Sequence, residues 1–301
     1  MNNAPAAHRL VIVGQGAIGS LLAAKAQQQQ VDYGVIPRNK QPLAMHYQHL
    51  ASGLSVDFTP TLVTQLSPQD IILLPLKAFQ IDNALAHLTI PTAASIVLMH
   101  NGMGTIEQTQ ARLPNNPILA ATTSYGVYKP HSNTLVETGQ GKTAIGWVQH
   151  PNTTVQQCLQ SFFAKGLGPL HWHKHIQLAL WQKLAVNAVI NPLTAIHQIK
   201  NGGLQDPQFN NVIHEICQEV TLVMQSLNMP VTIEALKDNV REVIINTANN
   251  YSSMNRDIAA GRPSEIDFIN GYIVQQADKL GINVSRNQRL WQQVSQLAQQ
   301  S

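Results

Sequence analysis

A short apolar segment followed at once by a glycine-rich turn constrains the fold of this chain more than any other feature. Residues 10–13 (LVIV) have the composition of a buried parallel strand. The sequence Gly14-Gln15-Gly16-Ala17-Ile18-Gly19 follows directly, and residues 20–30 are compatible with a helix. A GxGxxG pattern is weak evidence alone, but between a strand and a helix each glycine has a structural task.

The structural roles of the three glycines predict a dinucleotide-binding site. Gly14 permits the tight turn, Gly16 lets the backbone approach a pyrophosphate, and Gly19 lets helix and strand pack closely. The N-terminus of the predicted helix then offers free backbone N–H groups to the anion. The alternative is a glycine-rich turn that binds no ligand.

The next predicted strand, residues 31–36, indicates which dinucleotide binds. An NAD enzyme usually places Asp or Glu at the end of this strand to accept hydrogen bonds from the ribose hydroxyls. Here Arg38 stands there, with Lys40 nearby. A guanidinium can bind a 2′-phosphate bidentately, so the sequence favours NADP(H) over NAD(H). Alternatively, Arg38 is a solvated loop cation.

Two further apolar segments end in polar residues. Residues 70–76 (DIILLPL) run into Lys77, with Gln80 one turn on, and residues 95–99 (SIVLM) precede Asn101. Ligands of open α/β sheets bind beyond the carboxyl ends of the strands, so these side chains are expected to face the cofactor. More strands are expected at residues 118–125 and near Val136 and Ile145, with Gly139 and Gly141 in a turn that joins antiparallel neighbours.

An apolar helix with one polar stripe is predicted over residues 181–191 (WQKLAVNAVIN). Lys183, Asn187 and Asn191 recur every four residues and therefore share one face. Buried polar groups of this kind are costly unless they are paired, which fits the wall of a polar cleft. A hydrogen-bond network between two helices explains the stripe equally well. Pro192 is expected to end the helix.

From about residue 176 the chain carries only long helical periodicities, at residues 207–227, 232–249, 267–280 and from about 287. We therefore expect an α/β fold in which a Rossmann-type dinucleotide-binding domain (residues 1–174) precedes an all-helical domain (residues 175–301). At residues 261–265, Gly261 suits a helix stop and Pro263 a helix start, which would place Glu265 in a first turn as a capping residue.

Composition excludes several classes of function. The formal net charge of +3 is small and scattered, which argues against nucleic acid or a membrane surface as partner. No segment is apolar enough to cross a bilayer, and Cys158 and Cys217 have the setting of buried thiols, so we expect a cytoplasmic protein. The alternating histidines of HWHKH (residues 171–175) have no acidic or Cys neighbour, and no metal site is expected there.

The chain closely resembles the 2-dehydropantoate 2-reductase (ketopantoate reductase) family, from Leu10 to about Leu290. Its motifs stand in the family's order and spacing: GQGAIG, LKAFQ, MHNGMGT, WQKLAVNAVINPLTA, SSMNRD and GRPSEIDFING. The resemblance implies NADPH-dependent reduction of 2-dehydropantoate to (R)-pantoate, a step toward pantothenate and coenzyme A. The departures from the family pattern are mild, at Gln15 and at Gly202-Gly203.

The resemblance also implies roles for individual residues. It assigns Lys183 as the general acid, with Glu265 close to both that lysine and the cofactor ribose. The implied cofactor-binding residues are Gly14, Gln15, Gly16, Ala17, Ile18, Gly19, Arg38, Lys77, Gln80, Asn101 and Glu265. The implied substrate-binding residues are Asn101, Lys183, Asn187, Asn191, Asn201 and Ser253.

Two other interpretations of the sequence remain open. One is an NADP-dependent dehydrogenase of the same layout that acts on another small 2-oxo or 3-hydroxy acid. The other is a non-catalytic NADP(H)-binding sensor, against which the presence of Lys183, Asn101 and Glu265 argues. The sequence leaves the oligomeric state open, a homodimer included.

Overall fold

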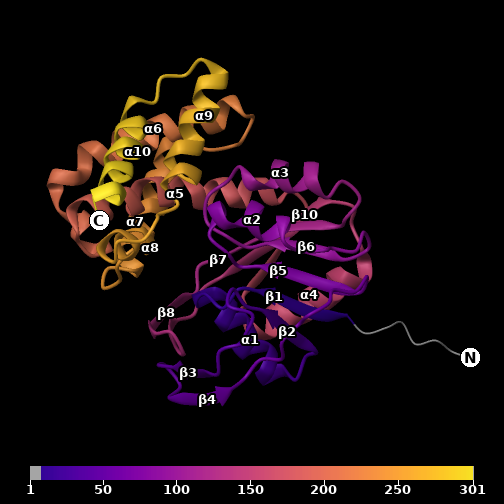
Figure 1. Cartoon of the computed structure of the whole chain (residues 1–301). Helices are drawn as coiled ribbons and strands as arrows, with labels where there is room; N and C mark the ends of the chain where they lie inside the picture. Colours follow the sequence, from indigo (N-terminus) through magenta and orange to yellow (C-terminus); the bar gives the residue numbers. More distant parts are fainter. Residues whose placement is uncertain (1–7, 301) are drawn as a thin grey trace, which may run out of the picture. The chain divides into compact units, whose positions relative to one another are not determined.

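The computed structural model describes residues 8–300. The chain divides into two compact units (Figure 1). The α/β unit comprises the described part of Met1–His100 together with Thr105–Ile176. The helical unit comprises Asn101–Gly104 and the described part of Gln177–Ser301. The short loop Asn101–Gly104 therefore belongs with the helices, although it follows a strand of the α/β unit in sequence.

A mixed sheet forms the centre of the α/β unit. Within residues 8–300 its strands lie in the order β11 (Leu170–His173), β10 (Thr143–Gln149), β7 (Ile118–Thr123), β6 (Ser95–Leu98), β5 (Asp70–Leu74), β1 (Arg9–Val13) and β2 (Tyr33–Ile36). The five strands from β7 to β2 are parallel, whereas β10 pairs antiparallel with β7 and parallel with β11. The predicted Rossmann-type sheet, with β1 directly before the glycine loop, is confirmed.

A second, smaller sheet lies beside helix α1 (Ala17–Gln29) and has the order β4 (Leu54–Phe58), β3 (Met45–His49), β9 (Thr134–Gly139), β8 (Gly126–His131). The expectation that Gly139 and Gly141 join antiparallel neighbours was wrong. The strand before this turn, β9, belongs to the small sheet, and the strand after it, β10, belongs to the main one. Gly141 lets the chain cross between the sheets, because a Cβ there would lie 2.3 Å from the Tyr125 nitrogen, whereas a Cβ at Gly139 would meet nothing within 4 Å.

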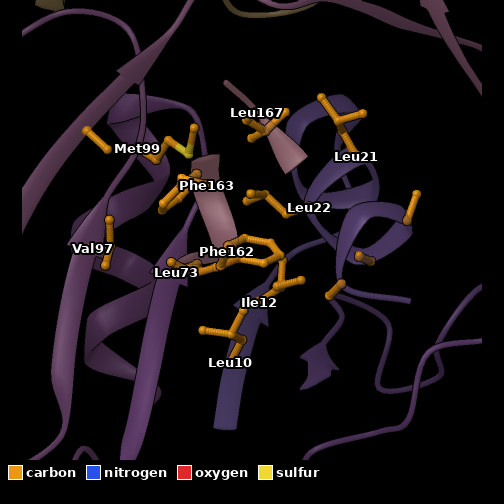
Figure 2. Close-up of a cluster of buried hydrophobic side chains, with 14 of the residues drawn as sticks. Leu10, Ile12, Leu21, Leu22, Leu73, Val97, Met99, Phe162, Phe163 and Leu167 are labelled. Carbon is orange, nitrogen blue, oxygen red and sulfur yellow. The ribbon is translucent and has the colours of Figure 1, made fainter. Parts of the chain in front are cut away.

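The core of the α/β unit lies between the main sheet and two helices, α1 and α4 (Thr153–Gly166). Figure 2 shows Leu10 and Ile12 of β1 near Leu22 of α1 and Phe162 of α4. These four side chains are all almost fully buried, so the strand that leads into the glycine loop is rigidly held. The shorter helices of this unit are η1 (Ala78–Gln80), α2 (Ile81–Ala86) and α3 (Thr105–Arg112).

An ionic cluster fastens the small sheet to α1. The Lys25 ammonium lies 2.8 Å from the Glu137 carboxylate and 2.9 Å from the Tyr47 hydroxyl, which itself donates to Glu137. Burial and this carboxylate raise the pKa of Tyr47 far above its usual range. The small sheet is therefore fixed to the helix that starts at the glycine loop.

The helical unit contains, among the described residues, the helices α5 (Ile176–His197), α6 (Asn210–Ser226), α7 (Ile233–Asn246), α8 (Ser253–Ala259), α9 (Asn270–Leu280) and α10 (Ser285–Gln300), with short 3-10 turns η2 (Asn201–Gln205), η3 (Pro207–Phe209) and η4 (Ile266–Phe268). No strand interrupts them within the described residues. The expected fold class, a Rossmann-type α/β domain followed by an all-helical one, is confirmed.

The expected helix end at Pro192 was wrong, because α5 continues to His197. Proline has no N–H, so the carbonyl of Ala188, four residues earlier, loses its partner within the helix. The Asn270 side chain, fully buried on α9, donates to that carbonyl at 3.0 Å. A neighbouring helix thus supplies the missing donor, and the helix continues through the proline.

The expectation at residues 261–265 was wrong in part. Gly261 has φ +61° just after α8, as a helix stop requires. Pro263 does not start a helix, since α9 begins only at Asn270 after the turn η4. Glu265 precedes that turn without capping it and is only 3% exposed. A buried carboxylate is costly unless a positive charge or a hydrogen-bond donor lies near it. For Glu265 this positive charge is the Lys183 ammonium.

Candidate active site

The glycine loop in the α/β unit has the backbone of a phosphate-binding turn. Gly14 has φ +89°, a conformation that residues with a Cβ rarely adopt. A Cβ at Gly19 would lie 2.3 Å from the Gly14 carbonyl oxygen, so α1 could not approach the loop this closely with any other residue. Both glycines are explained by the protein's own packing.

Gly16 is different, because no contact with a described residue requires a glycine there. Its φ of −66° suits any residue, and a Cβ there would meet no described atom within 4 Å. No described side chain caps the first turn of α1, where Ala17 and Ile18 lie. Open space over uncapped helix N–H groups fits a pyrophosphate, which would occupy the place of the missing Cβ.

The loop after β2 is held beside this turn by Gln15. Its side-chain amide accepts from the Leu43 backbone N–H at 2.9 Å and donates to the Leu43 carbonyl at 3.2 Å. Arg38 lies exposed in this loop, two residues beyond the end of β2, and has no ion pair with any described carboxylate. A guanidinium in this position remains open to an anionic ligand.

Lys77 and Gln80 form a compact turn at the end of β5. The Gln80 side-chain oxygen accepts from the Lys77 backbone N–H at 3.1 Å, across η1. Gln80 therefore fixes the turn that carries Lys77, and both side chains are partly exposed.

Asn101 lies in the loop that belongs to the helical unit. The Met103 N–H donates to the Phe268 carbonyl at 2.8 Å, and a Cβ at Gly102 would lie 2.5 Å from the same oxygen. The sequence placed Asn101 at the end of a Rossmann strand, and the structure places its loop against the turn that follows Glu265.

On α5, Lys183 and Asn187 are partly buried, and Asn191 is 6% exposed. Burial lowers the pKa of the Lys183 ammonium to about 8, while the negative charge of Glu265 opposes this change. An ammonium with a pKa near the physiological range can give up and regain a proton readily. The polar stripe thus contains an acid suited to proton transfer and two amides suited to binding.

Asn201 and Ser253 differ in their surroundings. The Asn201 amide nitrogen donates to the Thr247 hydroxyl at 2.8 Å, but its buried oxygen has no partner among the described residues. An orphaned acceptor of this kind is what a substrate hydroxyl could satisfy. Ser253 is exposed at the start of α8, whereas the adjacent Ser252 is buried as the cap of that helix.

Two residues of interest were missed from the sequence. Asn270 donates to the Ala188 carbonyl of α5, and from the sequence Pro192 indicates only that this carbonyl needs some donor. Lys129, on β8, donates to the Gln15 carbonyl oxygen in the glycine loop at 2.9 Å. The two are 114 positions apart in sequence, and no local pattern indicates this contact.

Metal and membrane features are not found in residues 8–300. No group of three or more potential metal ligands occurs there. His171 and His173 lie on β11 with ring centroids 6.4 Å apart, but His175 lies beyond the strand. No described helix is both long and apolar enough to span a membrane.

A Rossmann-type sheet with an open glycine loop, joined in one chain to a helical unit that contains an ammonium of lowered pKa, is typical of dinucleotide-dependent oxidoreductases. Two family models match most of the chain: "Ketopantoate reductase PanE/ApbA" over residues 10–150 and "Ketopantoate reductase PanE/ApbA C terminal" over residues 175–298. The chain belongs to the ketopantoate reductase family.

Individual relatives agree with this assignment. The chain is 39% identical to the 2-dehydropantoate 2-reductase of Vibrio cholerae over 296 residues, which is 96% of this chain and 98% of the relative. It is 36% identical to that of Escherichia coli O157:H7, over 95% and 94% of the two chains.

Solved structures share the fold. A ketopantoate reductase from Ralstonia eutropha JMP134 aligns with a TM-score of 0.82 at 22% identity, over 97% of this chain and 99% of that one. A D-mandelate dehydrogenase solved with NADH and anilino(oxo)acetate aligns with a TM-score of 0.86 at 20% identity, over the same shares.

Proposed function

We propose that this protein reduces 2-dehydropantoate to (R)-pantoate with NADPH. Its relatives in Vibrio cholerae and Escherichia coli O157:H7 carry the name of this activity and match nearly the whole chain. In this proposal the α/β unit binds the cofactor, and the helical unit binds the substrate and carries the proton donor.

The observation that carries the proposal is the lowered pKa of the Lys183 ammonium. When NADPH is bound, its reduced nicotinamide supplies hydride to the ketone carbon of the substrate. Negative charge then develops on the ketone oxygen, and Lys183 stabilises that charge and delivers a proton to it. A pKa of about 8 suits this step, because the ammonium is largely protonated at neutral pH yet transfers its proton easily.

Other groups of the helical unit prepare Lys183 and hold the substrate in this proposal. Glu265 keeps the ammonium protonated by opposing the effect of burial on its pKa. Asn187, Asn191 and Asn201 offer amide groups to the substrate carboxylate and hydroxyl, and Asn101 and Ser253 add to this set. Fixing these two groups presents one face of the ketone to the hydride, which accounts for a single product enantiomer.

The preference for NADPH over NADH rests on Arg38. The Gln15 amide holds the loop of Arg38 next to the glycine turn, and no described carboxylate neutralises the guanidinium. No Asp or Glu stands at the end of β2 to bind unphosphorylated ribose. Lys77, Gln80 and Asn101 complete the proposed cofactor-binding residues.

A second candidate function is reduction of another 2-oxo acid. The solved D-mandelate dehydrogenase, which contains NADH, has the same fold over nearly the full length of this chain. A homodimer is a further proposal, because a ketopantoate reductase of the same fold from Staphylococcus aureus is dimeric.

The test is NADPH oxidation, followed by its absorbance, with 2-dehydropantoate and a panel of other 2-oxo acids. We expect the highest kcat/KM with 2-dehydropantoate and an (R) product. A higher kcat/KM with an aromatic 2-oxo acid would favour the second candidate, and no turnover with any of them would reject both. Light scattering of the purified protein tests the dimer.

A further inference from the structure

The α/β unit contains a second cation beside the glycine loop, on an element outside the strand–loop–helix motif. Lys129 belongs to β8 of the small sheet, and its ammonium donates to the Gln15 carbonyl oxygen at 2.9 Å. The Ser20 hydroxyl donates to the same oxygen at 3.2 Å. The oxygen and the Gly16 nitrogen belong to one peptide group, so the ammonium binds the glycine loop at the carbonyl side of the peptide bond that precedes Gly16.

This ammonium has no negative partner among residues 8–300. Lys129 makes no ion pair with a carboxylate among the described residues, and its one hydrogen bond is to a neutral carbonyl. Lys25, which also lies between α1 and the small sheet, has the Glu137 carboxylate at 2.8 Å. Of these two lysines, only the one next to the glycine loop lacks a counter-charge.

The position of Lys129 is electrostatically unfavourable in the protein alone. It is half-buried, and burial lowers the pKa of its ammonium. It also lies beside the N-terminus of α1, where the helix dipole is positive and repels a cation. A bound anion at the open Gly16 would relieve both penalties, since it would interact favourably with the helix N-terminus and with the ammonium.

We propose that Lys129 is a phosphate-binding residue of the cofactor site and contacts the dinucleotide from the small sheet. The inference rests on the proposed function, because it takes the dinucleotide as the anion. Two phosphate groups are within reach of this part of the site. The pyrophosphate would lie over Gly16, and the 2′-phosphate would lie at the loop of Arg38, which Gln15 holds to the same turn.

The experiment compares cofactor affinity in the wild type and in Lys129→Gln, measured by the fluorescence of NADPH and of NADH. Glutamine keeps a donor for the Gln15 carbonyl and removes the positive charge. The variant therefore tests the effect of the charge on binding separately from that of the hydrogen bond to the loop. Loss of a charge-assisted phosphate contact should weaken binding about 10- to 100-fold. Weaker binding of both cofactors places the pyrophosphate at Lys129, and weaker binding of NADPH alone places the 2′-phosphate there.

Two further variants keep the test decisive. Lys129→Arg should bind NADPH nearly as the wild type does, because it retains the charge. Lys165→Gln is the matched control: Lys165 is an exposed cation at the end of α4, next to Gly166, which lies against Gln29 and Lys25 in the second half of α1, away from the loop. This variant should leave the affinity unchanged.

The salt dependence of binding shows whether Lys129 neutralises a phosphate or only holds the glycine loop in place through its hydrogen bond. If Lys129 neutralises a phosphate, the affinity of Lys129→Gln should depend less steeply on salt than that of the wild type. Wild-type affinity in Lys129→Gln, or weaker binding with an unchanged salt dependence, would overturn the inference. A wild-type protein that binds neither cofactor would instead reject the proposed function itself.

Discussion

Raising the pH through 8 should remove the proton that Lys183, as the proposed general acid, supplies to the ketone oxygen. Burial in the helical unit lowers the pKa of this ammonium from 10.5 to about 8 even though Glu265 acts in the opposite direction. A change of that size corresponds to about 3 kcal/mol, which disfavours the charged form. Because only the protonated form can act as general acid, kcat/KM for ketone reduction should be constant below about pH 7 and fall about tenfold per pH unit above 8.

Glu265→Gln tests the cause of this pKa. The Glu265 carboxylate raises the pKa of Lys183, so the pKa should fall further when this charge is removed. The descending part of the pH profile should then move about one pH unit lower. Glu242→Gln is the control, because it removes an exposed carboxylate on α7 of the same unit and should leave the profile in place.

The assay is NADPH oxidation at constant ionic strength, with the cofactor saturating at every pH. Saturation matters because the pKa of Lys129 is also lowered, and its deprotonation would weaken NADPH binding over an alkaline range. A profile that stays flat from pH 7 to about 10, or a Glu265→Gln profile that moves to higher pH, would refute the assignment of Lys183 as general acid.

Three more predictions follow from the structure. Arg38→Ala should raise KM for NADPH about 10- to 100-fold and leave KM for NADH nearly unchanged. An equal rise of KM for both cofactors would show that Arg38 does not bind the 2′-phosphate. Gly16→Ala should fold with an unchanged melting temperature but bind NADPH about tenfold or more weakly, since only a ligand needs that space; unchanged binding would contradict this. Asn270→Leu should lower the free energy of unfolding by about 1–3 kcal/mol in urea titrations, because the Ala188 carbonyl, four residues before Pro192, loses its donor. Wild-type stability of this variant would show that the hydrogen bond is dispensable.

The features that could be predicted from sequence depend on neighbours in the chain. The strand, the glycine loop and the helix after it form one continuous segment, so the positive φ of Gly14 and the close packing at Gly19 follow from local pattern. The polar stripe of α5 likewise follows from helical spacing. Such features place the cofactor loop and the candidate acid without knowledge of the fold.

The features that could not be predicted depend on contacts between distant segments. Pro192 is normally a helix breaker, and only Asn270, 82 positions from Ala188, allows α5 to continue. Glu265 has the sequence context of a capping residue but is buried and interacts with Lys183. Gly139 and Gly141 look like a hairpin turn, although the chain crosses there between two sheets. In each case a tertiary interaction overrides the local preference.

The central claim is that the partly buried ammonium of Lys183 protonates the oxygen of the ketone as it is reduced. Turnover of Lys183→Ala at saturating NADPH and 2-dehydropantoate tests this claim most directly. We expect kcat to fall by about 10²- to 10⁴-fold while the affinity for NADPH, measured by fluorescence, is retained. Turnover close to that of the wild type, with the cofactor bound equally well, would contradict the claim.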